Sequence, residues 1–140
     1  MWVDGRLLLQ LRDFAAGIQD PGLWGLFGGH LAPEESDDAG IRRELSEEIG
    51  CCPALARVGS LTVDDVALVG YRGVLDVPVN ALVLGEGQDL AAFTIPELEC
   101  GRLYSPRLRQ SFSMTAITQH ALDVWCGIRH GASSAGCPTT

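Results

Sequence analysis

Three glutamates at positions i, i + 3 and i + 4 lie in a segment that carries the end signals of a helix. Glu44, Glu47 and Glu48 would share one face of that helix within about one turn. Ser36 before the segment is a favoured N-cap residue, and Gly50 after it suits the left-handed conformation that ends many helices. The sequence therefore predicts a short helix between these two residues that presents a cluster of carboxylates.

The acidic cluster does not stabilise the helix that carries it. Ile41, Leu45 and Ile49 repeat on another face and form the expected buried stripe. Like charges at this spacing destabilise an isolated helix by a few tenths of a kcal/mol per pair. A hard divalent cation explains the acids, because Mg²⁺ prefers carboxylate oxygens and completes its shell with water and substrate phosphate. The alternative is a solvated acidic face without a ligand.

The residues around the helix extend this motif at fixed spacing. They run Gly29, five residues, Glu35, seven residues, Arg43-Glu44-Leu45, one residue, Glu47-Glu48, one residue, Gly50-Cys51. The pattern resembles the signature of the Nudix hydrolases, G-x5-E-x7-R-E-U-x-E-E-x-G-U, where U is a bulky aliphatic residue. Every fixed position matches except the last, which is Cys51. Ordinary residue frequencies would produce such a match on the order of once in a billion starts, so the resemblance favours a functional cluster over a solvated face.

The resemblance implies an enzyme that hydrolyses a pyrophosphate bond in a small nucleoside diphosphate-linked substrate. Water would attack phosphorus with the help of Mg²⁺, with Mn²⁺ as an alternative ion. The implied metal ligands are Glu44, Glu47 and Glu48. The family pattern gives Arg43 the role of orienting these glutamates, and Glu35 that of tying the preceding loop to the helix.

A further glutamate, Glu86, lies between Gly85 and Gly87 after the strand-rich region 55–84. Taken alone, a glutamate between glycines is most often a turn residue. The loop resembles the place where MutT-type Nudix proteins supply another glutamate to the metal cluster. We therefore expect Glu86 to complete the metal shell, and either Glu44 or Glu86 to be the general base.

Two glycines and two aromatic residues precede the helix. Gly28 and Gly29 allow close approach of the backbone to a ligand, and the resemblance implies that they form a loop on the phosphate side of the site. Trp24 and Phe27 have two interpretations, as core residues or as a wall of the substrate pocket on which a base or sugar stacks.

Strand-like segments and two helices predict an α/β/α sandwich around a mixed β-sheet, which agrees with the Nudix fold. The expected strands are 6–12, 23–27, three segments within 55–84, and 91–95. Ser105-Pro106 predicts the start of a final helix, and the domain is expected to span 1–128 with a flexible tail at 129–140. The first strand has only about three residues. This leaves open a short sheet edge, an edge completed by a partner chain in a homodimer, or a truncated start.

Composition excludes several classes of function. The 140 residues carry a formal net charge of −8, whereas a nucleic-acid groove needs a basic surface. There is no apolar run of 18 residues and no signal-peptide pattern, so we expect a soluble, cytoplasmic protein with reduced, mostly buried cysteines and no membrane partner. The rival function is a non-catalytic nucleotide-binding or sensor module, but such degenerate domains lose acids that this chain keeps. The short chain slightly favours nucleoside triphosphates or nucleotide sugars as substrates.

Overall fold

The computed structural model describes residues 1–131, so most of the expected tail (132–140) lies outside the described residues. Four strands form a central sheet in which β2 pairs with all three others, each time in antiparallel orientation. Single parallel bridges join Trp2 to Val74 and Trp24 to Met114, so parallel and antiparallel pairs are both present. The four strands are β1 (Trp2–Val3), β2 (Arg6–Leu11), β3 (Trp24–Gly25) and β6 (Asp89–Phe93).

Strand β2 is the centre of the core. Its sequence, RLLLQL, is buried at every position after Arg6, as expected for a strand covered on both faces. Leu7, Leu9 and Leu11 belong to one buried cluster and Leu8 to another, because successive side chains of a strand point to opposite faces. This central strand therefore fixes the positions of the loops at both of its ends.

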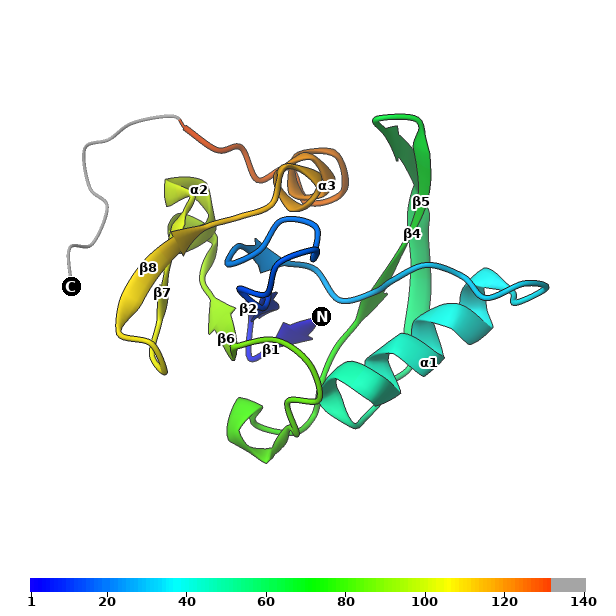
Figure 1. The fold of residues 1–140 in the computed structure, drawn as a ribbon, viewed down its shortest axis with the longest axis horizontal. Helices are drawn as coiled ribbons and strands as arrows, with labels where there is room; N and C mark the ends of the chain where they lie inside the picture. Colours follow the sequence, from blue (N-terminus) through cyan, green and yellow to red (C-terminus); the bar gives the residue numbers. More distant parts are fainter. Residues whose placement is uncertain (132–140) are drawn as a thin grey trace.

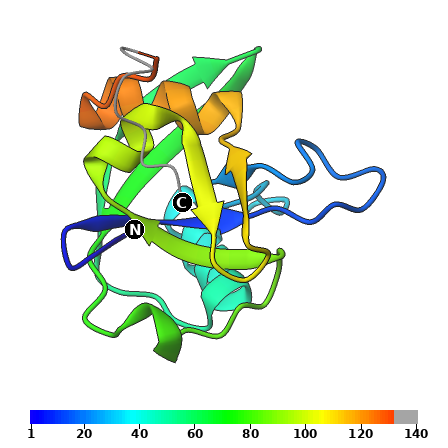
Figure 2. The same ribbon diagram turned by 90° about the vertical axis from the view of Figure 1, so that its left-hand side faces the viewer.

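Helices and two separate hairpins surround the central sheet. In Figure 1, α1 and α3 lie on different sides of the central strands, which agrees with the predicted sandwich. Figure 2 shows the same arrangement turned by 90°, with the hairpin of residues 102–113 toward the viewer and that of residues 55–73 behind α3. The elements are α1 (Asp37–Ile49), the β4–β5 hairpin (Leu55–Val63 and Val66–Gly73), a 3₁₀ turn (Val79–Ala81), α2 (Ile95–Cys100), the β7–β8 hairpin (Arg102–Ser105 and Gln110–Ser113) and α3 (Ala116–Cys126). No helix within residues 1–131 is long and apolar enough to cross a membrane.

The helix predicted to start at Ser105 is absent, and a hairpin turn takes its place. The Ser105 hydroxyl is buried, donates to Asp89 Oδ2 over 2.5 Å, and accepts from the Leu108 N–H at 3.1 Å. Arg109, with φ of 55°, then closes the turn. The last helix begins after Thr115, whose side chain accepts from the backbone N–H of residue 118. Ser-Pro signals were misread because they occur in turns as well as at helix starts.

The expectation of reduced cysteines holds for only part of the chain. Cys51, Cys52 and Cys126 are free thiols, but the first two are only partly buried and Cys126 is exposed, so the expectation of burial was wrong for these three. Cys100 is disulfide-bonded, so the expectation was wrong for this residue.

Trp24 lies in the core and not at a surface. Its side chain is fully buried, its ring packs edge-to-face on Phe93 with 4.9 Å between centroids, and Nε1 donates to the Leu103 carbonyl at 3.0 Å. No part of the ring is left for a substrate to contact, so the structure favours the packing interpretation. Phe27 is partly buried and packs against the cluster of Val3, Leu8 and Leu75.

We expect the substitution Trp24→Ala to lower the free energy of unfolding by about 3–5 kcal/mol, because it leaves a large cavity in the core. Urea denaturation measures this change. Trp24→Phe is the matched control: it keeps an aromatic ring but leaves the Leu103 carbonyl without its donor, so we expect a smaller loss. Equal stabilities of Trp24→Ala and the unchanged protein would contradict the placement of this ring.

Candidate active site

Helix α1 forms where its end signals predicted. The Ser36 side chain accepts from the Ala39 N–H at 3.2 Å, and Gly50 adopts the left-handed conformation with φ of 71°. Leu45 and Ile49 are buried, which confirms the apolar stripe at these two positions. Because this stripe faces the core, the glutamates are held on a different part of the helix surface.

Arg43 ties the loop before α1 to the helix. Its Nε and Nη2 donate to the two carboxylate oxygens of Glu35 at 2.8 and 3.0 Å, and Nη2 also donates to the His30 carbonyl at 3.2 Å. The bond to Arg43, together with one from the Ala32 N–H, lowers the pKa of Glu35 to about 2. Such bidentate pairs have a fixed geometry, so the loop has a defined position on the helix.

Gly40 allows the same loop to lie close to the helix. A Cβ at this position would overlap Leu31 Cδ2 and approach the Glu35 carboxylate at 3.5 Å. A glycine inside a helix costs about 1 kcal/mol relative to alanine. The atom that such a Cβ would overlap is the end of the half-exposed Leu31 side chain, which would have to move to accept an alanine.

The glycine pair lies directly against two of the helix glutamates. The Gly28 N–H donates to Glu48 Oε2 at 3.0 Å. A Cβ on Gly29 would lie 2.5 Å from Glu44 Oε1, a contact that real Cβ atoms essentially never make. The backbone of this loop and the acids of α1 therefore share one site, as the spacing of the motif predicted.

The Glu86 loop (residues 85–88) joins the end of α1 to the central strand. The Gly85 N–H donates to the Glu48 carbonyl at 2.8 Å. From the other side, Gln10 Nε2 donates to the Glu86 carbonyl at 2.5 Å. Gln10 is a buried polar residue in the apolar strand β2, a signal that the sequence contained but that was not used. These two bonds position Glu86 beside the acids of α1.

Glu48 is the buried acid of the site, with 4% of its surface exposed. Burial raises its pKa to about 8, and the Glu44 and Glu86 carboxylates add to this, whereas the Gly28 N–H and Arg12 oppose it. The three carboxylates thus lie within electrostatic reach of one another. Arg12, at the end of β2, is a second residue that the sequence did not single out.

The donor set fits a hard divalent cation, because it consists of carboxylates whose mutual repulsion a positive charge would relieve. Their present arrangement differs from the expected one. Arg43 Nη1 donates to Glu44 Oε1 at 2.8 Å and to Glu47 Oε2 at 3.3 Å, and the Glu47 side chain is 49% exposed. In the part of the chain that the structure describes, no three histidine, cysteine, aspartate or glutamate side chains converge on a point where an ion could sit. Arg43 thus supplies to Glu44 and Glu47 the positive charge that an ion would supply.

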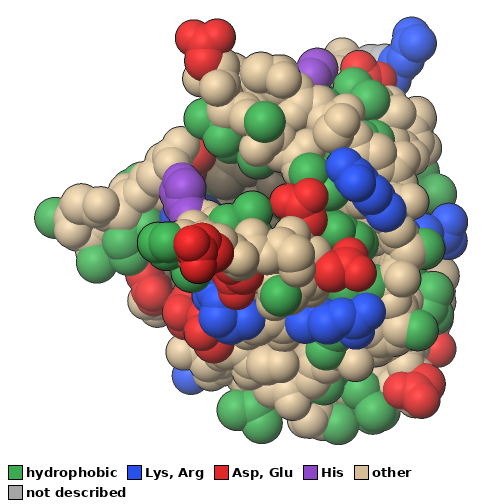
Figure 3. Space-filling model, turned by 90° about the vertical axis from the view of Figure 1, so that its right-hand side faces the viewer, with side chains coloured by type: hydrophobic (Ala, Val, Ile, Leu, Met, Phe, Trp, Pro, Cys, Tyr) green, Lys and Arg blue, Asp and Glu red, His purple; other side chains and the backbone are tan. Residues whose placement is uncertain are grey.

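Figure 3 shows the face of the molecule where α1 begins. Acidic and arginine side chains lie side by side on it, and the surface is hollowed next to them. The mixture of charges agrees with the ion pairs of Arg43.

A comparison with known protein families shows which family contains this chain. The family model of the NUDIX domain matches residues 3–99, which is more than half of the chain. The chain belongs to the NUDIX domain family. This confirms the resemblance that the spacing from Gly29 to Cys51 had indicated.

Several solved structures share the Nudix fold with this chain. The MutT protein of Methanosarcina mazei Go1 has 21% sequence identity and a TM-score of 0.56, over 69% of this chain and 73% of that one. An Ap4A hydrolase of C. elegans has 19% identity and a TM-score of 0.53, over 66% and 71%. A MutT/nudix family protein of Enterococcus faecalis has 24% identity and a TM-score of 0.53 over 63% of this chain, which spans only 36% of that protein. No curated protein matches the Nudix chain by sequence.

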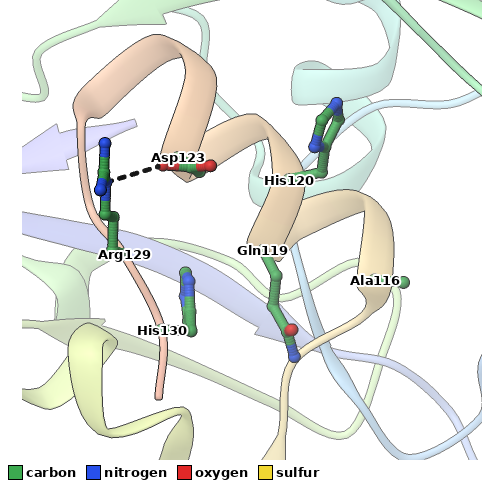
Figure 4. Close-up of a pocket in the computed structure, with 6 residues that line it drawn as sticks. All are labelled: Ala116, Gln119, His120, Asp123, Arg129 and His130. Atoms are coloured by element: carbon green, nitrogen blue, oxygen red, sulfur yellow. Dashed lines mark ion pairs between the residues drawn. The ribbon is translucent and has the colours of Figure 1, made fainter. Parts of the chain in front are cut away.

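A second hollow, of about 470 Å³, lies on α3 away from the acids of α1. Figure 4 shows Arg129 beside Asp123, with 3.7 Å between Nε and Oδ1, while His120 and His130 lie apart from one another. The hollow is lined by Ala116, Gln119, His120, Asp123, Arg129 and His130. None of these residues belongs to the Nudix motif, so the hollow is separate from the candidate active site.

The raised pKa of Glu48 predicts how stability depends on pH in metal-free protein. Unfolded, this carboxyl titrates near its ordinary value of 4.5; folded, it titrates near 8. The folded state therefore keeps a proton that the unfolded state has lost. The contribution of this proton to the free energy of unfolding is fully present below pH 4.5. Above that pH it falls by up to about 1.4 kcal/mol per pH unit, and it is lost as the pH passes 8.

Glu48→Gln removes this titration, so in EDTA the variant should be more stable than the unchanged protein at pH 8 and similar to it at pH 5. Thermal denaturation at both pH values measures the difference. His130 and the amino terminus have lowered pKa values and titrate in both proteins, so they cancel in the comparison. An equal difference at the two pH values would contradict the assigned environment of Glu48.

Proposed function

We propose that this Nudix chain is a divalent-metal-dependent pyrophosphohydrolase that acts on a small nucleoside diphosphate-linked substrate. Its family and its fold support a hydrolase of the Nudix type. The observation that carries the proposal is the environment of Glu48, which is buried, accepts a hydrogen bond from the Gly28 N–H, and is under the electrostatic influence of Glu44 and Glu86. A buried acid with two acidic neighbours is costly for the fold, and a bound cation explains why the site retains it.

The chain's own residues have distinct roles in this proposal. Glu44, Glu48 and Glu86 would hold the ion, and Glu47 would join them on leaving Arg43. When bound, Mg²⁺ or Mn²⁺ would offset negative charge on the phosphate oxygens. Glu44 or Glu86 would accept the proton of the attacking water.

Two further groups support these acids. Arg43 keeps the loop at Glu35 in place and balances the charge of Glu44 while no cation is present. The backbone at Gly28 leaves room for a phosphate group next to the acids, because nothing lies within 4 Å of the place that a Cβ would take there, whereas at Gly29 that place is occupied by the Glu44 carboxylate.

Nucleoside triphosphates or nucleotide sugars are the proposed substrates. The C. elegans neighbour is named as an Ap4A hydrolase, which supports a nucleotide substrate with linked phosphates. The net charge of −8 argues against nucleic acid as a partner. A cytoplasmic location remains a prediction from the sequence.

A panel of nucleoside triphosphates, nucleotide sugars and dinucleoside polyphosphates tests the proposal. We expect at least one compound to be hydrolysed with Mg²⁺ and none with EDTA. In ¹⁸O-labelled water the label should appear on a phosphate product, because water attacks phosphorus. Tight binding of a nucleotide without turnover of any compound would instead support the non-catalytic sensor.

A further inference from the structure

The loop that follows β2, residues 12–23, forms an arm with a defined shape. The Arg12 N–H donates to the Leu23 carbonyl at 3.0 Å, and Arg12 Nε donates to the Gln19 carbonyl at 2.8 Å. These bonds run across the arm and hold its two sides together. In Figure 2 the arm (blue) projects from the body of the molecule. Side chains near its base therefore have fixed positions.

Phe14 is the aromatic residue of this arm, and 51% of its surface is exposed. The ring is nevertheless held in place by two contacts. It tilts against the ring of Phe112 on β8, with 5.7 Å between the centroids and 53° between the planes. It also covers Gly22 so closely that a Cβ on that glycine would lie 2.5 Å from Phe14 Cε1. An aromatic ring that is fixed in position and still exposed can stack on a ligand with little loss of conformational freedom.

The base of the arm is bonded to the loop that carries Glu86. Asp13, the residue before the ring, accepts from Gln88 Nε2 at 2.8 Å, and Gln88 is two residues after Glu86. Arg12, one residue earlier, is close enough to Glu48 for its charge to act on that carboxyl group. Consecutive Cα atoms are only about 3.8 Å apart, so the ring belongs to the surroundings of the acid cluster.

We propose that Phe14 is the stacking platform for the base of the nucleotide whose phosphates lie at the acids of α1. The identity of this ligand rests on the proposed function. The bond between Asp13 and Gln88 holds the platform at a set distance from Glu86, so a stacked base places its linked phosphates at the acids. Every base has a π face, so the platform binds a nucleoside without reading which base it carries.

The neighbours of the ring favour a nucleobase over an alkyl chain as the ligand. A long alkyl group would need an apolar groove to enclose it. The residues after Phe14 are Ala15, Ala16 and Gly17, which are small and exposed. They leave the ring open to solvent and add no apolar wall, which suits a flat ligand with polar edges.

Two compounds test the proposal: the nucleoside triphosphate that the protein hydrolyses fastest, and ribose 5-triphosphate, which carries the same phosphates without a base. Phe14→Ala should lower the ratio of their kcat/KM values at least about tenfold. Most of the change should lie in KM, because the ring contacts the base equally in the ground state and in the transition state. For a compound that is not hydrolysed, the dissociation constant from calorimetry takes the place of KM.

Two further substitutions separate stacking from simple apolar contact. Phe14→Tyr keeps the π face and should keep the selectivity for the compound with a base. Phe14→Leu keeps an apolar side chain but no ring, and should behave as Phe14→Ala does. Val124→Ala is the matched control, because it shortens a side chain of similar exposure, 54%, on α3 and outside the arm. It should leave the ratio unchanged, and circular dichroism verifies that each variant is folded.

An unchanged ratio in the folded Phe14→Ala protein would overturn the proposal. Full selectivity in Phe14→Leu would also overturn it, because the ring would then act as apolar cover and not as a stacking platform. The two proposals can fail separately. If no compound is hydrolysed but the dissociation constants show the same dependence on the ring, the proposed function is refuted and this inference stands.

Discussion

Glutamine in place of Glu48 is expected to lower kcat by at least about 10³-fold on whichever compound the protein turns over. The substitution keeps the size of the side chain and its ability to accept the Gly28 N–H, but the amide cannot lose a proton to become the carboxylate that would hold the ion. Because the amide is easier to bury than the carboxylate, the fold should be retained or stabilised. Steady-state kinetics with saturating Mg²⁺, alongside circular dichroism, measure both effects.

Glu99→Gln is the matched control for this variant. It makes the same chemical change at an exposed residue of α2, away from the acid cluster, and should leave kcat within about twofold of its original value. Comparable activity of the Glu48→Gln and Glu99→Gln proteins would remove Glu48 from the mechanism.

Gly85→Ala is the second change with a large expected effect. A Cβ at this position would overlap the backbone carbonyl oxygen of Glu47, which a rotation of a side chain cannot relieve. The Glu86 loop must then move away from α1 and lose its bond to the Glu48 carbonyl. We expect a loss of about 1–3 kcal/mol of stability and at least a tenfold loss of kcat, because Glu86 no longer lies beside Glu48.

Gly25→Ala controls for the general effect of an added methyl group. A Cβ there would make only ordinary contacts, 3.7 Å from Arg12 Cδ and 3.8 Å from Thr115 Cγ2. It should therefore change stability and turnover less than Gly85→Ala. If the two variants behaved alike, the close contact between the Glu86 loop and α1 would not be what positions Glu86.

The features that the sequence predicted correctly are those with local causes. Ser36, Gly50 and the apolar repeat between them lie within about a dozen residues, so the position and the ends of α1 could be predicted from neighbouring residues. The pairing of Arg43 with Glu35 came from the family pattern, and the structure shows it as two direct bonds.

The features that were missed depend on contacts between distant parts of the chain. Gln10 and Glu86 are 76 positions apart, and no local pattern connects them. Ser105 looked like a helix start because its buried partner, Asp89, is 16 residues away in another strand. Periodicity shows which face of an element is buried but not which distant polar group a side chain will meet.

The orientation of the glutamate side chains also could not be predicted from the sequence. Their spacing places them on neighbouring parts of one helix, but each side chain then takes the partner that its surroundings offer. Glu48 turns to the Gly28 N–H, and Glu47 turns to Arg43. The choice between Arg43 and a cation as the partner of Glu44 depends on a competition between charges, which a motif does not encode.

The binding of Mn²⁺, followed by electron paramagnetic resonance in metal-free buffer, tests the central claim most directly. The unchanged protein should bind the ion at a site from which Mg²⁺ displaces it, and Glu48→Gln and Glu86→Gln should each weaken binding at least tenfold. The Glu99→Gln protein should bind as the unchanged protein does. Absence of binding, or equal affinity in all four proteins, would show that the acids around Glu48 are not a metal site.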